Sequence, residues 1–158
     1  MGYYKRAAVC LNGHAETSDV EFKRPRPHCP ECGEQIITTC QSCGDSIQGR
    51  YQVDGVVTVG RPYAPPAFCA NCGTAHPWTT ASFEAVIEIA EGSGDLDSNA
   101  IEQLREALPH LVRDTPKTQA AAFKVAGIVV KLGSRAKPIV DNMIAHLATK
   151  AAMKILKQ

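Results

Sequence analysis

The sequence predicts a small α+β protein in which a cysteine-rich module of short antiparallel hairpins precedes an all-α region of about four helices. All seven cysteines, seven of the nine aromatic residues and seven of the ten prolines lie before residue 79. The rest of the chain is rich in alanine, leucine, lysine and glutamate, which favour helices. We therefore divide the chain into residues 1–78 and residues 79–158.

Short strands separated by turns are expected in residues 1–78. The clearest hairpin is Tyr51–Val59, where Asp54 and Gly55 stand between two β-branched runs and suit a tight turn. Three prolines in residues 61–68 predict an extended loop, because proline fixes its own φ angle and restricts the residue before it.

Four helices are expected in residues 79–158, each with a start or a stop signal. The expected spans are residues 79–92, 97–109, 115–132 and 139–155. Asp97 or Ser98 caps the second helix, which Pro109 ends or kinks, and Thr115 followed by Pro116 starts the third. The apolar residues of the fourth helix fall in one stripe.

Charge and hydropathy exclude several classes of protein. The formal net charge is +1, which is unlike a globally basic nucleic-acid binder. Its distribution is uneven, because residues 79–114 carry six more acidic than basic side chains and residues 115–158 carry seven more basic than acidic. No apolar run approaches the roughly 20 residues of a membrane span, and the first residues lack the apolar stretch of a signal peptide. We expect a cytoplasmic protein.

Four pairs of metal-ligand residues are visible in residues 1–78. One pair has three residues between a cysteine and a histidine, and three pairs have two residues between cysteines and a glycine directly after: Cys10 and His14, Cys29 and Cys32, Cys40 and Cys43, Cys69 and Cys72. Two intervening residues allow one tight turn to aim both sulfurs at one ion. An odd number of cysteines also argues against a disulfide framework. The pattern predicts two structural zinc ions.

Four pairs can form two sites in three ways. Sequential grouping places Cys10, His14, Cys29 and Cys32 in site 1 and Cys40, Cys43, Cys69 and Cys72 in site 2. Nested grouping joins the two central pairs, and cross-brace grouping joins alternate pairs. We favour sequential grouping because each loop between pairs can then supply its own hairpin. His28 and His76 flank the pairs and are expected to be supporting or surface residues.

No enzyme is predicted. Each site has four protein ligands and therefore keeps no open position for water. His14-Ala-Glu16 followed by Cys29-Pro-Glu-Cys32 superficially matches the zinc deaminase pattern. Cys10 closes that site with a fourth ligand, however, and the 12-residue gap is too short for the helix and strand that separate the two motifs in deaminases.

The motifs of the first half resemble those of an uncharacterised bacterial family, a domain of unknown function. The likeness is carried by Val9–His14, Cys29–Gly33, Cys40–Cys43, Ile47–Gly49, Phe68–Gly73 and His76–Thr79, and by Leu108–Pro109 and Asp114–Pro116 in the second half. The resemblance implies a bacterial origin and an N-terminal double zinc-ribbon module with a helical C-terminal region. It implies no activity.

Three functions remain open. The leading hypothesis is an adaptor or regulatory protein, whose zinc-ribbon module presents Tyr51, Tyr63, the Pro65-Pro66 loop and Trp78 to a protein partner while the helices pack, self-associate or dock. The alternative is nucleic-acid binding through the basic and aromatic residues between Tyr3 and Arg26. Least favoured is a membrane-surface role for the last helix. No small-molecule substrate is predicted.

Overall fold

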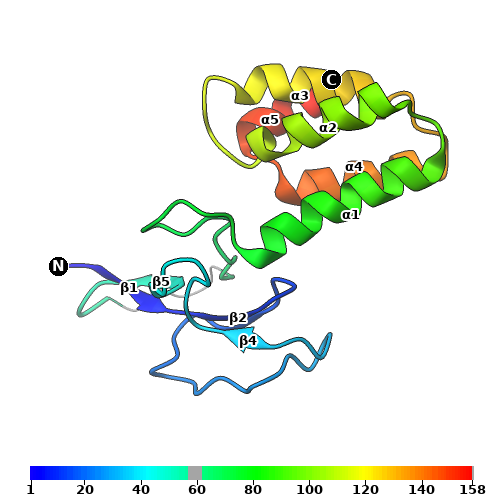
Figure 1. Ribbon diagram of the computed structural model, residues 1–158. Helices are drawn as coiled ribbons and strands as arrows, with labels where there is room; N and C mark the ends of the chain where they lie inside the picture. The colour runs from blue at the N-terminus through cyan, green and yellow to red at the C-terminus, as the bar shows by residue number, and fades with distance from the viewer. Residues whose placement is uncertain (57–61, 158) are drawn as a thin grey trace. The chain divides into compact units, whose positions relative to one another are not determined.

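The computed structural model describes residues 1–56 and 62–157, and it divides into two compact units. The first unit, Met1–Thr80, is called here the N-terminal module, and the second, Ala81–Gln158, the helical unit. The boundary falls inside helix α1 (Pro77–Ser93), whose first turn belongs to the module. Short antiparallel strands in the module and helices after it confirm the predicted α+β class (Figure 1).

The strands of the module form two small antiparallel sheets. β1 (Tyr3–Arg6) pairs with β5 (Gln48–Gln52), and β2 (Ala8–Cys10) lies between β3 (Ala15–Thr17) and β4 (Ile36–Ile37). Both sheets contain a register shift, which bends such short strands strongly. The sheets are too small to form a core by themselves.

The predicted hairpin at Tyr51–Val59 is described only in its first half. β5 ends at Gln52, and Val56 donates a backbone hydrogen bond to Val53 across a turn in which Gly55 has a φ of 79°. The returning residues of this hairpin lie outside the described part of the chain. The described part of the proline loop, residues 62–67, is irregular as predicted.

The apolar core of the module is small and is built around Trp78. It consists of four buried residues and two partly buried ones: Ala7, Val9, Ile47, Trp78, Ile37 and Tyr63. The indole of Trp78 donates to the carbonyl of Pro66, and the hydroxyl of Tyr63 donates to the carbonyl of Gln48. The expectation that Trp78 faces a partner is therefore wrong, because a module this small uses its indole for its own packing, whereas Tyr63 is only partly buried.

Asp19 holds the loop after β3 in place through hydrogen bonds and ion pairs. Its side chain is 7% exposed, accepts hydrogen bonds from the N–H groups of Glu21 and Phe22, and pairs with Arg50 at 3.1 Å. Burial alone would raise the pKa of this carboxyl, but the two N–H groups and the nearby charges of Lys5 and Arg50 hold it below its ordinary value.

We predict that Asp19→Asn destabilises the module by about 2 kcal/mol at neutral pH, since the buried network loses its negative charge and the oxygen that accepts from Arg50. A lowered folded-state pKa gives stability that is complete above the ordinary carboxyl pKa of about 4 and is lost as the pH falls through the folded value. The difference between variant and parent should therefore be equal at pH values of about 5.5 and 7.5. Urea unfolding followed by Trp78 fluorescence measures it, and a difference that changes across that interval would contradict the assignment.

Within the described residues, the helical unit contains five helices where about four are predicted. After α1 come α2 (Ser98–Leu111), α3 (Thr118–Val129), α4 (Ala136–Leu147) and α5 (Lys150–Leu156). α3 packs against both α2 and α5, and one apolar core joins all five helices (Figure 1). Its largest fully buried side chains include Leu104, Leu108 and Leu111 of α2.

The predicted fourth helix is broken in two at Ala148 and Thr149. Thr149 adopts an extended conformation, and its side chain accepts a hydrogen bond from the N–H of Ala152, so it caps a new helix. Its own N–H donates to the carbonyl of Leu111 at the end of α2. The break brings Ala152 into the core, while Ile139 in the predicted apolar stripe is 52% exposed.

Several other helix boundaries differ from the predictions, and among them α3 ends at Val129 rather than at Leu132 and α4 begins at Ala136 rather than after Pro138. α1 begins at Pro77 rather than at Thr79, because proline is well suited to a first helical position. α2 has the predicted Asp97 cap but continues two residues past Pro109. α3 begins at Thr118, since the Thr118 hydroxyl accepts from the N–H of Thr115 and holds the preceding turn outside the helix. In the described residues, no helix is both long and apolar enough to cross a membrane.

Candidate metal centres

The three cysteine pairs fold into the same turn, called here a knuckle. In each, the first cysteine donates its N–H to the carbonyl five residues later and accepts, through its carbonyl, the N–H of the glycine four residues later: Cys29 with Glu34 and Gly33, Cys40 with Asp45 and Gly44, Cys69 with Thr74 and Gly73. The three glycines have φ angles between 71° and 77°, a region that L-residues rarely adopt. The glycine after each pair therefore closes the turn.

The first pair uses a different turn with the same result. Cys10 is the last residue of β2 and is completely buried, and Gly13 turns the chain with a φ of 89°. The N–H of His14 then lies 3.2 Å from the Cys10 sulfur. The turn therefore places the side chain of His14 next to the sulfur of Cys10.

The ligand atoms of the first two pairs meet in one cluster, site 1. Nδ1 of His14 lies 3.4 Å from the Cys10 sulfur and 3.6 Å from the Cys29 sulfur. The sulfurs of Cys10 and Cys32 are 3.7 Å apart. All four ligand atoms lie within 4.8 Å of one another.

The ligand atoms of the last two knuckles meet in site 2. Cys40 and Cys72 have sulfurs 3.8 Å apart, and Cys43 and Cys69 have sulfurs 3.7 Å apart. The four sulfurs again lie within 4.8 Å of one another. The structure thus brings the predicted ligand residues together in the sequential grouping rather than in the nested or cross-brace grouping.

These separations fit a single ion in each site. Ligands about 2.3 Å from a tetrahedral metal have sulfurs about 3.8 Å apart, which is the spacing found here. A disulfide would need a sulfur separation of about 2.05 Å, and all seven cysteines are free thiols. Two Cys/His clusters in the described residues are therefore positioned to bind metal ions.

Each site is buried on one side and exposed on the other. The first cysteine of every knuckle is 5% exposed, whereas Cys32, Cys43 and Cys72 are exposed. The N–H of Glu34 lowers the pKa of Cys32 to about 6, and hydrogen bonds from the side chain and backbone of Thr74 lower that of Cys72 to about 6. These groups stabilise the thiolate, which is the form that binds metal.

Glu31 supports the histidine ligand of site 1, a role that the spacing of the cysteines does not reveal. His14 turns Nδ1 to the sulfurs, and its Nε2 lies 3.7 Å from a carboxylate oxygen of Glu31. A carboxylate in this position orients a ligand histidine and raises its basicity. Glu31 stands between the two cysteines of the first knuckle, and this position is the sequence feature that could have identified it.

We predict that Glu31→Gln weakens metal binding at site 1 by about tenfold, at the low end for such contacts because the Glu31 side chain is 69% exposed. Competition with a chromophoric chelator measures this affinity. Glu34→Gln is the matched control, because Glu34 lies in the same knuckle and serves site 1 through its backbone. Equal losses in the two variants would count against the role of Glu31.

His76 and His28 do not belong to either ligand cluster. His76 is 2% exposed and stacks on Trp78 with ring centroids 4.5 Å apart. Its Nδ1 finds no hydrogen-bond partner among the described residues, and burial lowers its pKa. His76 therefore packs the module core and is not a surface residue, whereas His28 is exposed.

Comparison with known proteins identifies a family but no characterised relative. Residues 3–156 match a family model described as an uncharacterized protein conserved in bacteria, DUF2321. No curated protein and no solved structure matches the chain.

Proposed function

Since the chain belongs to this uncharacterised bacterial family, we propose its function from its own geometry. It is a cytosolic, non-enzymatic adaptor or regulatory protein, whose N-terminal module is held by two zinc ions and presents a tyrosine-rich surface to a protein partner. The cytosol keeps thiols reduced, which suits seven free cysteines. The observation that carries the proposal is a module that combines two complete four-ligand clusters with exposed tyrosines.

Zinc is the metal that best fits the ligands. Site 1 offers three sulfurs and one imidazole nitrogen, and site 2 offers four sulfurs. Zinc and iron–sulfur clusters both take such soft, tetrahedral sets. A cluster distributes its cysteines over several iron atoms and would hold them farther apart, whereas sulfurs 3.7 Å apart suit one small ion.

A structural role for the metal follows from the number of ligands. Four protein ligands leave no open position for a water or a substrate, as a catalytic zinc requires. Glu16, the residue that a deaminase would use to move protons, accepts two hydrogen bonds from Arg26 and pairs with Lys23 at 3.0 Å. The hydrogen bonds from Arg26 are the main reason that the pKa of Glu16 is lowered, which leaves it a poor proton donor.

The surface proposed for partner binding lies on the sheet of β1 and β5. Tyr4 and Tyr51, called here the tyrosine face, are 57% and 49% exposed, and Tyr3, 46% exposed, lies on the other side of β1 beside Lys5 because successive side chains of a strand alternate. Tyr4 and Tyr51 stand opposite each other in the register and pack edge to face, with ring centroids 5.0 Å apart. Rigid tyrosines are the side chains that most often anchor protein interfaces.

Nucleic acid is the competing partner class, and ion pairing disfavours it. Lys5 pairs with Glu21 at 2.8 Å, and the cations of Lys23 and Arg26 both pair with Glu16. Lysine and arginine side chains that neutralise phosphates release the counterions of the nucleic acid, and this release drives binding. A cation already paired with a carboxylate contributes less to this effect. Arg6 and Arg24, for which the described residues offer no ion pair, keep the alternative open to test.

The test is a tagged pull-down from the bacterial host, with and without nuclease, using two variants. Tyr4→Ser with Tyr51→Ser removes the tyrosine face while leaving the module core in place. Phe123→Ser is the matched control, because Phe123 is an equally apolar side chain, 78% exposed, on α3 of the helical unit.

The proposal predicts a defined protein that survives nuclease, is lost with the tyrosine variant and is retained with Phe123→Ser. Loss of the partner after nuclease treatment would favour the nucleic-acid alternative. Equal recovery with both variants would contradict the tyrosine face as the binding surface.

A further inference from the structure

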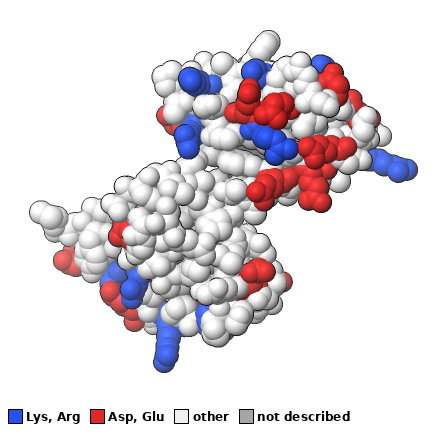
Figure 2. Space-filling model, in the orientation of Figure 1, with Lys and Arg blue, Asp and Glu red and all other residues white. Residues whose placement is uncertain are grey.

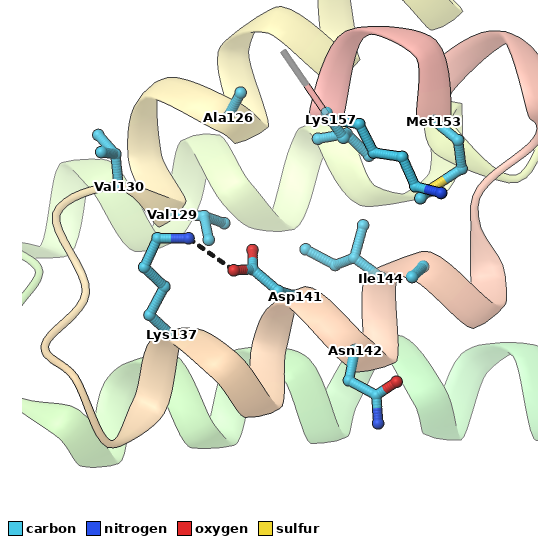
Figure 3. A pocket seen from close by; sticks show the side chains of 11 residues that line it. Ala126, Val129, Val130, Lys137, Asp141, Asn142, Ile144, Met153 and Lys157 are labelled. Atoms are coloured by element: carbon cyan, nitrogen blue, oxygen red, sulfur yellow. Dashed lines mark hydrogen bonds and ion pairs between the residues drawn. The ribbon is translucent and has the colours of Figure 1, made fainter.

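The helical unit contains a groove that no sequence motif predicts. It has a volume of about 630 Å³ and lies between α3, α4 and α5 (Figure 3). Side chains of Val129, Ile144 and Met153 converge on it from the three helices. The other aliphatic residues around it are Ala126, Val130, Ala145 and Leu156. The lining contains no aromatic ring, and its polar groups are Lys137, Asp141, Asn142 and Lys157.

The shape and chemistry of the groove favour a hydrocarbon chain. Its volume is in the range of small-molecule sites. A wholly aliphatic floor offers no hydrogen-bond partner to a polar or heteroaromatic ligand, which would lose its bonds to water on entering. Val130 at the rim is 67% exposed, so apolar surface now faces solvent there. A flexible alkyl chain removes such surface from water without needing polar contacts.

The charges around the groove favour an anion at one end of that chain. Residues 115–158 carry eight basic side chains and a single acidic one, Asp141. Asp141 lies at the groove and is neutralised by Lys137 on the preceding turn of α4. Lys157 also lines the groove and has no ion pair in the residues that the structure describes. The acidic side chains of the helical unit gather instead on α1 and α2 (Figure 2).

A second copy of the chain fits the groove poorly. Its acidic helices, α1 and α2, would match the charge of the groove. Their apolar residues, however, are buried in the core of their own unit, with Val86, Leu104 and Leu108 at most 1% exposed. A second copy that docks through α1 and α2 therefore brings negative charge but leaves its large apolar side chains in its own core.

We propose that this groove binds a single-chain anionic amphiphile, an alkyl chain with a carboxylate or a similar head group. The chain lies along Val130, Ala145 and Met153, over the nearly buried Val129 and Ile144, and the head group pairs with Lys157. The site is independent of the metal module and of the partner proposed for it.

Dodecanoate below its critical micelle concentration is the probe, and methionine methyl signals in NMR are the readout. Met153 of α5 lines the groove, whereas Met143 of α4 packs against the core. Saturable shifts at Met153, with much smaller shifts at Met143, are expected at one molecule per chain. No saturable shift at Met153 would overturn the proposal, as would a shift that requires anionic lipid vesicles.

Two pairs of variants at exposed positions distinguish binding in the groove from nonspecific binding elsewhere on the surface, without disturbing the core. Ala145→Trp fills the groove, while His146→Trp puts the same side chain on the next residue, outside the lining. Ala145→Trp should weaken dodecanoate binding by roughly tenfold or more, and His146→Trp by less than about twofold. Equal effects of these two variants would overturn the assignment of the groove.

The second pair tests the head group. Lys157→Glu should weaken dodecanoate binding by roughly fivefold and leave binding of neutral dodecanol unchanged, since only the carboxylate feels the charge. Lys154→Glu makes the same charge change on α5 away from the lining and should have little effect. Equal losses for the acid and the alcohol would contradict the role assigned to Lys157.

Discussion

Removal of the metal by a strong chelator will unfold the N-terminal module and leave the helical unit folded. Among the described residues, the apolar cluster of the module has four buried side chains, led by Ile47 and Trp78, which is too little apolar surface to hold about 80 residues. Structural zinc supplies roughly 10–16 kcal/mol of binding free energy per ion in small domains, and in such domains this energy drives folding. The helical unit has its own core of helices and no ligand residue in it.

The single tryptophan makes this prediction easy to measure. Trp78 is 8% exposed and lies in the module, so its emission should shift to longer wavelength as the metal is removed. Far-UV circular dichroism, which is dominated by the helices, should change little. Cys69→Ser, which removes a buried ligand of site 2, should shift the emission of Trp78 part of the way in the same direction while site 1 keeps its ion. Unchanged Trp78 emission after complete removal of the metal would contradict a folding role for it.

Gly49→Ala will be the most damaging glycine-to-alanine substitution in the module. Gly49 is buried in β5, and a Cβ there would collide with the carbonyl oxygen of Ser18 and lie 2.8 Å from that of Lys5. Ser18 accepts a hydrogen bond from Arg50, so relief of the collision must displace paired backbone. We expect a loss of at least about 3 kcal/mol, the upper part of the range for overpacking.

Gly127→Ala provides the matched control with the opposite sign. Gly127 lies on the exposed side of α3, and a Cβ there would meet nothing within 4 Å. Alanine should stabilise the helical unit by about 1 kcal/mol, because glycine is the poorer residue in a helix interior. Thermal unfolding of both variants, followed by Trp78 fluorescence and by circular dichroism, separates the two effects. A Gly49→Ala protein as stable as its parent would show that β5 does not pack as described.

Much of the ligand geometry could be predicted from spacing alone. Two residues between cysteines leave few conformations in which both sulfurs reach one ion, and the following glycine permits the positive φ that closes the turn. The order of the pairs along the chain favoured sequential grouping, and the ligand atoms group in that order in the structure. These features are local, so a short motif contains nearly all the information they need.

The features that the sequence did not reveal depend on contacts between distant segments. The approach of Glu31 to His14 requires the first knuckle to fold against β2, and motif spacing does not encode this contact. Trp78 and His76 follow the last knuckle by only a few residues, and their burial depends on β2 and on the segment before β5. The break at Thr149 was hidden because apolar periodicity continues through it while the local cap ends the helix.

The account rests on two structural zinc ions in one module. Native mass spectrometry of the purified protein counts and identifies bound metal directly. We predict two zinc ions per chain in the parent protein, and one in each of Cys10→Ser and Cys69→Ser, which remove buried ligands of site 1 and site 2. A single ion in the parent, an iron–sulfur cluster, or loss of both ions from either variant would contradict two independent closed sites.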